Sequence, residues 1–264
     1  MNEPRTHQDY GVRQIEAAHR VLVDLGQVLG SYLRESIVVV GGWVPDLLLP
    51  DAAEPHVGSI DVDLALDAVK LEEGRYAEIA DLLLATGRYR LTDRLFKLRA
   101  AVDLSDGGVE IDVDVDFLKP VGKGRRRKGK PLVPGFRPLD ADGCGAAFHA
   151  PKLVKVRGQT IDGSENGVQV LVAELPDFLI MKAYALAGRD KPKDAYDICY
   201  SLEYESGGIE RLARSWAERV SDPLVAEAIG HLREKFATVG SFGPRQVAHF
   251  HDATSAEERD MLAR

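Results

Sequence analysis

The chain has 264 residues, of which 45% are hydrophobic and 29% are charged. These values are ordinary for a folded globular protein, and the length suffices for one large domain or two small ones. The net charge of −8 argues against a protein that coats nucleic acid through general basicity. A local basic patch is nevertheless present and is considered below.

The sequence gives no sign of export or of membrane insertion. Residues 1–6 lack the charged and then apolar layout of a signal peptide, and no apolar run reaches the roughly 18 residues that a membrane span needs. Cys144 and Cys199 show no metal-type spacing and are interpreted as reduced thiols. We therefore expect a cytoplasmic protein with no membrane partner.

The first half of the chain mixes helical and strand patterns. In chain order the sequence predicts a helix over 10–33, a strand over 37–40, a short helix reaching 47–49, a loop over 50–58, a strand around 60–66 and a helix over 71–85. A hairpin follows, with arms over 96–104 and 109–118 joined by a turn at 105–108. Residues 119–145 are rich in proline and glycine and predict a long loop, and a strand over 168–173 closes this half.

The second half is predicted to be nearly all helical. Helices are expected over 176–187, 192–203, 209–220 and 223–236, with a further one near the C-terminus. The expected fold class is α/β (α+β), with a mixed sheet flanked by helices. We expect two domains, a catalytic one over 1–174 and a helical one over 175–264.

The most informative signal is a pair of aspartates, Asp61 and Asp63, on an expected strand. Side chains alternate along a strand, so both carboxylates face the same way while Val62 and Leu64 face the core. Carboxylates held side by side repel each other unless a cation lies between them. We therefore expect these aspartates to bind a hard, oxygen-loving ion such as Mg²⁺ or Mn²⁺.

A glycine pair, Gly41-Gly42, follows the buried strand upstream of the aspartates. Glycine lets a phosphate approach backbone N–H groups closely. Ser59 lies on the same face of its strand as Asp61 and is a candidate to hydrogen-bond a phosphate, although a strand-entry turn also explains it. Together these residues predict a site for a nucleoside triphosphate (NTP) with its metal.

Metal-assisted nucleotidyl transfer also needs a third carboxylate from a neighbouring strand. The second hairpin arm alternates cleanly, and one of its faces carries Glu110, Asp112, Asp114 and Asp116. Asp116 is the first choice as the third metal ligand, because the chain leaves the strand just after it. Asp114 is the alternative, and the pattern does not separate these two from Asp112.

Two further candidates lie in the helical half. Lys182 sits on an apolar helix, where a lysine usually extends its ammonium group to water. Asp194 lies at the start of the next helix, where an acidic residue meets the helix dipole favourably. The functional alternative is that Lys182 contacts the triphosphate and Asp194 orients it, and the residues alone leave both readings open.

A basic segment follows the third-carboxylate strand. It carries Lys119 and then six candidate nucleic-acid-binding residues, Lys123, Arg125, Arg126, Arg127, Lys128 and Lys130. With no acidic residue among them, they are suited to grip a phosphate backbone, and the alternatives are a solvated loop or a contact with an acidic partner protein. Trp43 and His56 are expected near the site, where a structural role is favoured for each and contact with a base or phosphate is the alternative.

These motifs resemble the DNA polymerase β-type nucleotidyltransferase superfamily, whose pattern is a glycine turn, then Asp-x-Asp, then a later carboxylate. Within it the chain is most similar to the AbiEii/MenT family of toxins. Ser59-Ile60-Asp61-Val62-Asp63-Leu64 matches that family's Ser-x-Asp-x-Asp-Leu element. Lys182, followed by Arg189-x-Lys191-x-Lys193-Asp194-x-x-Asp197-Ile198, resembles its second element. Trp43-Val44-Pro45-Asp46 departs from the family, being bulkier than the small residues common after the glycines.

The resemblance implies a nucleotidyltransferase-type fold and transfer of a nucleotide from an NTP to an acceptor. For some family members that acceptor is the 3′ end of tRNA, and the toxin belongs to a type IV-like toxin–antitoxin system with a cognate antitoxin. The resemblance implies Asp61, Asp63, Asp116, Lys182 and Asp194 as catalytic residues. A small-molecule nucleotidyltransferase that modifies an antibiotic, and a catalytically idle binding module of the same fold, are the alternatives.

Overall fold

The structure is a computed structural model that describes residues 4–67, 69–71, 73–121, 134–253 and 255–262. The six residues of the predicted nucleic-acid-binding loop, Lys123 to Lys130, lie outside the described residues. That prediction is therefore not addressed by the structure.

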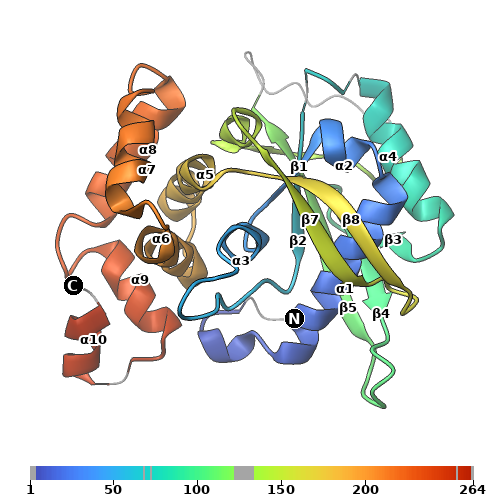
Figure 1. Cartoon of the computed structure of the whole chain (residues 1–264), viewed down its shortest axis with the longest axis horizontal. Coiled ribbons are helices and arrows are strands. Elements are labelled where there is room, and N and C mark those ends of the chain that lie inside the picture. Colours follow the sequence, from blue (N-terminus) through green and yellow to red (C-terminus); the bar gives the residue numbers. More distant parts are fainter. Residues whose placement is uncertain (1–3, 68, 72, 122–133, 254, 263–264) are drawn as a thin grey trace.

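A mixed sheet forms the centre of the first half (Figure 1). Its strands are β1 (Ile37–Val40), β2 (Val62–Leu66), β3 (Tyr89–Leu91), β4 (Lys97–Val102), β5 (Ile111–Pro120), β6 (Leu139–Ala141), β7 (Lys152–Gln159) and β8 (Glu165–Val172). Their order is β3-β4-β5-β2-β1-β8-β7, with β6 beside β5. The β2/β5, β1/β8 and β5/β6 pairs are parallel and the others are antiparallel. The predicted α/β fold class with a mixed sheet is confirmed.

Helices lie on both sides of this sheet in Figure 1. The first half contributes η1 (His7–Asp9), α1 (Val12–Leu29), α2 (Tyr32–Glu35), α3 (Trp43–Leu48), α4 (Glu73–Ala85) and η2 (Cys144–Phe148). The second half contributes α5 (Leu175–Gly188), α6 (Pro192–Tyr204), α7 (Gly208–Ala217), α8 (Pro223–Lys235), α9 (Phe242–Phe250) and α10 (Ala256–Leu262). Among the described helices, none combines the length and apolarity that crossing a membrane requires.

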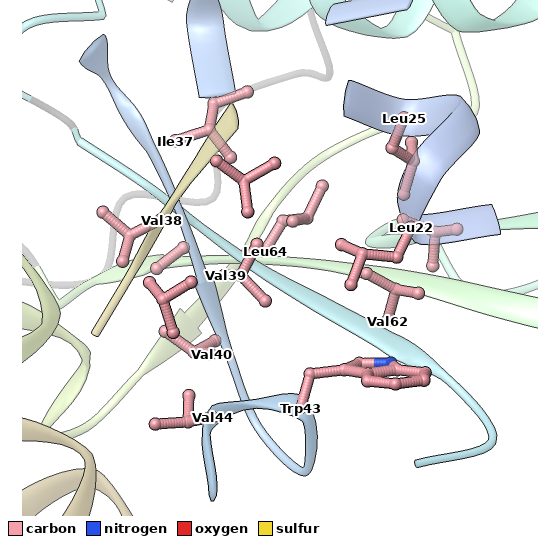
Figure 2. Close-up of a cluster of buried hydrophobic side chains, with 14 of the residues drawn as sticks. Leu22, Leu25, Ile37, Val38, Val39, Val40, Trp43, Val44, Val62 and Leu64 are labelled. Carbon is pink, nitrogen blue, oxygen red and sulfur yellow. The ribbon is translucent and has the colours of Figure 1, made fainter. Parts of the chain in front are cut away.

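The main core forms where α1 packs on the sheet (Figure 2). Leu22 and Leu25 of α1 face Val39 of β1 and the β2 residues Val62 and Leu64, and all five side chains are fully buried. β1 lies between two other strands and is covered on both faces, which explains why its four residues are all apolar instead of alternating. The core therefore fixes β1, which ends just before Gly41-Gly42, and β2, which carries Asp63.

The structure corrects several predicted boundaries. The edge strands β3 and β7 were not predicted, because β3 has only three residues and β7 carries the charged residues that edge strands tolerate. The predicted loop over 119–145 contains β6 and the start of η2, and the arm predicted over 109–118 reaches Pro120. Asp61 lies just before β2 instead of on it.

The expected domain boundary after residue 174 falls between the end of β8 and the start of α5. The predicted helices over 176–187, 192–203, 209–220 and 223–236 correspond to α5, α6, α7 and α8. The division into two domains stays a prediction.

Two helical glycines provide a test of how tightly α1 packs. A Cβ atom on Gly26 of α1 would lie 2.5 Å from the Val168 side chain, whereas nothing lies within 4 Å of the corresponding position on Gly230 of α8. We expect Gly26→Ala to lower the free energy of unfolding by about 1–3 kcal/mol through overpacking. Gly230→Ala, the matched control, should raise it by about 0.5–1 kcal/mol. Urea unfolding measures both, and stabilisation of both variants would contradict the packing.

Candidate active site

Strand pairing brings two of the predicted carboxylates together. β2 and β5 are parallel, and their register places Asp63 directly opposite Asp116. Asp61 lies two residues before Asp63, and all three aspartates line one cleft together with Gly42 and Ser59. Asp112 and Asp114 instead line a neighbouring groove. The geometry therefore favours Asp116 over Asp112 and Asp114.

The glycine pair makes room for this cleft. Gly41 has a φ of +71°, and a Cβ atom there would collide with Asp63 Oδ2, so only glycine fits without strain. A Cβ on Gly42 would lie 2.7 Å from Ser59 Oγ and 2.8 Å from Lys193 Nζ. The Ser59 hydroxyl donates a hydrogen bond of 2.7 Å to Asp61 Oδ1. Backbone, hydroxyl and ammonium groups thus meet at one end of the cleft.

Negative charge is crowded at the three aspartates. Burial raises the pKa of Asp63 to about 7, and the charges of Asp61 and Asp116 add to the shift. Burial also raises the pKa of Asp116, although the ammonium group of Lys97 opposes that effect. Such shifts are typical of carboxylates that share a site in which a cation would be stabilising.

Lys97 supplies positive charge at the edge of the cluster. Its Nζ lies 2.8 Å from Asp114 Oδ2 and 3.0 Å from Asp116 Oδ1. Arg99 completes the neutralisation of Asp114 with an Nε–Oδ1 distance of 2.6 Å. Asp114 is therefore held in ion pairs on both sides, which weakens it as the alternative metal ligand.

The donor set agrees with the expected metal. Asp61, Asp63 and Asp116 offer only carboxylate oxygens, which suit Mg²⁺ or Mn²⁺, and their mutual repulsion would fall on binding a cation. As the side chains stand, no group of three His, Cys, Asp or Glu residues in the described part of the chain has the arrangement of a metal site. The residues fit a divalent ion by their chemistry and crowding, and the ion itself stays a prediction.

The helical half contributes a buried ion network to the same cleft. Lys182 Nζ on α5 lies 2.8 Å from Asp194 Oδ1 and 2.7 Å from Asp197 Oδ2, both on α6. Arg189 Nε lies 2.7 Å from Asp194 Oδ2. Burial alone would raise the pKa of Asp194, but Lys182 and Arg189 outweigh it and lower that pKa to about 2. The network joins α5 to α6 through charges that stay ionised.

Lys193 was not singled out as a site residue from the sequence, yet it lies at the glycine end of the cleft. It is 4% exposed, and its Nζ pairs with Asp197 Oδ1 at 2.7 Å. Burial lowers the pKa of Lys193, and Asp197 opposes the shift. The signal that could have found it is its place in the Arg-x-Lys-x-Lys-Asp element, four residues before Asp197 on the same helix. Lys182 differs from Lys193 because its ammonium group pairs with two aspartates, Asp194 and Asp197.

His56 and Trp43 have the supporting positions expected of them. His56 Nε2 lies 3.0 Å from Asp197 Oδ1, and its Nδ1 accepts a hydrogen bond from the Gly58 N–H. The ring is therefore neutral with its proton on Nε2, and burial, aided by Lys193, lowers the pKa of His56 to about 4. Trp43 Nε1 donates to the Asp61 carbonyl at 2.8 Å. Both side chains fix the segment that carries Ser59 and Asp61.

The mixed sheet and the glycine turn facing crowded carboxylates agree with the nucleotidyltransferase resemblance of the sequence motifs. The family described as "Nucleotidyl transferase AbiEii toxin, Type IV TA system" matches residues 55–258. The chain belongs to this family, as the motif resemblance implied, and it is a nucleotidyltransferase.

Comparison with solved structures found a crystal structure of an antigenic nucleotidyltransferase-like protein from Paracoccidioides brasiliensis. The two are 15% identical, with 81% of this chain and 93% of that chain covered and a TM-score of 0.42. No curated protein matched the sequence.

The buried histidine predicts a pH effect on stability. The pKa of His56 lies below its ordinary value, so the unfolded chain binds the extra proton between about pH 6.5 and about pH 4, and stability is lost as pH falls through this window. Between about pH 7.5 and about pH 5 we expect the wild type to lose about 2 kcal/mol more than His56→Gln in urea unfolding. The exposed-site control His249→Gln should follow the wild type. Equal losses in all three proteins would contradict a buried, neutral His56.

Proposed function

We propose that this nucleotidyltransferase moves a nucleoside monophosphate from an NTP to tRNA, with a divalent metal, as the toxin of a type IV-like toxin–antitoxin system. The observation that carries the proposal is one cleft lined by Gly42, Ser59, Asp63, Asp116 and Lys193. It combines phosphate-binding groups and carboxylates, the two sets of groups that phosphoryl transfer requires. The family description supports the toxin role and an antitoxin partner.

The triphosphate is assigned to the glycine end of the cleft. There the Gly41-Gly42 turn, the Ser59 hydroxyl and the Lys193 ammonium group converge. Lys182 also lines the cleft but is committed to two aspartates, so we assign it to holding α6 and its Lys193 in place. Asp194 supports the site through Lys182.

The α-phosphorus is assigned to the carboxylate end. Asp61, Asp63 and Asp116 would hold the divalent ion, which supplies Lewis-acid activation of the phosphate when bound. The acceptor hydroxyl oxygen forms a bond to the α-phosphorus as the bond to pyrophosphate breaks. Asp61 and Asp116 both line the cleft and the neighbouring groove, and burial raises the pKa of Asp116, so we assign Asp116 to receive the hydroxyl proton. The catalytic domain over 1–174 would supply the metal-binding carboxylates, and the helical domain over 175–264 would supply Lys182 and Lys193.

A transfer assay tests the proposal. The protein is incubated with each labelled NTP, Mg²⁺ and total tRNA, alongside Asp61→Asn and Asp63→Asn. We expect label on tRNA from one or more NTPs, and at least about a 100-fold loss in both variants. Asp81→Asn, which removes an exposed carboxylate on α4, is the matched control and should retain activity.

The outcomes separate the alternatives. NTP binding without transfer to RNA would rule out the tRNA acceptor and direct the search to small-molecule acceptors. Absence of NTP binding with Mg²⁺ in calorimetry would favour the catalytically idle binding module. Full transfer by Asp61→Asn would show that the proposed carboxylates are not the catalytic ones.

The two buried lysines should differ when each is replaced by methionine. Lys193→Met leaves Asp197 paired with Lys182, so we expect a stable protein whose NTP dissociation constant rises about tenfold or more. Lys182→Met removes the cation that Asp194 and Asp197 share and leaves each with one other cation, Arg189 and Lys193 respectively, so we expect it to lower the free energy of unfolding by about 1.5–3 kcal/mol. Calorimetry and urea unfolding measure the two effects, with the exposed-site variant Lys155→Met as the control. If Lys182→Met weakened NTP binding and Lys193→Met lowered stability, Lys182 would be the phosphate-binding lysine and Lys193 the supporting one.

A further inference from the structure

The cleft is small for the ligand assigned to it. Its volume is about 90 Å³, whereas sites for small-molecule ligands enclose roughly 300–1,000 Å³. The neighbouring groove adds space at the carboxylate end, where Asp61 and Asp116 line both hollows. Gly42 and Lys193, at the phosphate end, line the cleft but not that groove. A triphosphate therefore fits at the phosphate end only after part of the wall moves.

Most of that wall is fixed by the fold. Asp63 and Asp116 lie on central strands of the sheet, and the buried lysines of α5 and α6 are held by ion pairs. Pro4 differs, because it belongs to a segment before α1, residues 4–9, in which every side chain is at least partly exposed. We call this segment the cover; it is drawn in the darkest blue in Figure 1. The cover is the part of the wall that is least constrained by packing.

The cover is folded on itself. The backbone N–H groups of Arg5 and Thr6 donate to Asp9 Oδ2 at 2.8 and 2.9 Å, and the Asp9 N–H donates to the Thr6 carbonyl at 3.1 Å. Tyr10 follows the cover and is buried against Phe250, with 5.8 Å between the ring centroids. The cover can therefore swing as one unit about the anchored Tyr10 and keep these hydrogen bonds.

The contacts that close the cover lie near the surface. Arg5 Nη2 lies 3.2 Å from Asp190 Oδ1, and Arg5 Nη1 donates to the Asp190 carbonyl at 3.1 Å. Asp190 belongs to the junction between α5 and α6, next to two residues that line the cleft. On another side, His7 Nδ1 lies 3.1 Å from the Phe250 carbonyl. The Arg5 and Asp190 side chains are 42% and 58% exposed, and ion pairs this exposed to water are weak and easily broken.

We propose that the cover is a gate: the Arg5–Asp190 pair holds it closed over the phosphate end, and the NTP enters only when it swings open about Tyr10. The inference rests on the proposed function, because it takes the triphosphate as the ligand of that end. The measured dissociation constant then equals that of the open form divided by the fraction of molecules that are open. Weakening the pair raises this fraction, so it strengthens triphosphate binding.

Binding of inorganic tripolyphosphate with Mg²⁺ tests the gate, because this probe needs the phosphate end alone. For Arg5→Gln we expect calorimetry to give a dissociation constant about two- to fivefold lower than that of the wild type, the range that loss of an exposed ion pair allows. The lost positive charge would by itself weaken anion binding, so a gain in affinity cannot come from charge. Arg211→Gln on α7 removes a guanidinium that is 44% exposed and ion-paired, and as the matched control it should bind as the wild type does.

A double-mutant cycle tests the closing pair itself. In the Asp190→Asn background, Arg5→Gln should bring no further gain in affinity, because the ion pair is already broken. A gain of equal size in both backgrounds would overturn the proposal, since it would not come from this pair. Unchanged or weaker binding by Arg5→Gln alone would also overturn it. If neither the wild type nor Arg5→Gln bound tripolyphosphate or ATP with Mg²⁺, the proposed function itself would be wrong.

Discussion

Mutual repulsion among partly buried carboxylates is the constraint on which the organisation of this molecule depends. The parallel pairing of β2 with β5 places Asp63 opposite Asp116, and the chain delivers Asp61 to the same cleft. An arrangement of this kind opposes folding unless positive charge or protons compensate for it. Lys97 pairs with Asp116, and burial and the neighbouring carboxylates raise the pKa of Asp63, which favours its neutral form. The compensation is incomplete, and a divalent cation would complete it.

The helical half places buried positive charge on the other side of the cleft. Its lysines are themselves buried, so they require anions of their own, and Asp194 and Asp197 provide them. The consequence is a cleft with negative charge on the sheet and positive charge on α5 and α6. A triphosphate with its metal matches this separation, since the metal meets the carboxylates while the terminal phosphates meet Lys193.

How far the sequence predicts this site depends on how local each signal is. Asp61 and Asp63 are two residues apart, so strand periodicity predicts a shared face, and both line the cleft although Asp61 lies just before β2. Asp116 was distinguishable from Asp114 only in part, because the distinction rests on the β2–β5 register and on the cross-strand position of Lys97. Lys193 was not predicted as a site residue, because the packing of the helices decides which of several lysines reaches the glycine turn. Strand β7 was missed for the related reason that an edge strand lacks the apolar run of a central one.

Trp43 shows how the family pattern and the fold can be reconciled. It is bulkier than the small residues common after the glycine pair, and a side chain pointing into the cleft would fill it. The indole instead turns away, packing against Leu22 and Val62 with 1% of its surface exposed (Figure 2). Its Nε1 donates to the Asp61 carbonyl, so the large side chain holds the carboxylate segment in place. The large side chain therefore stabilises the backbone around the cleft and does not fill the space beside Gly42.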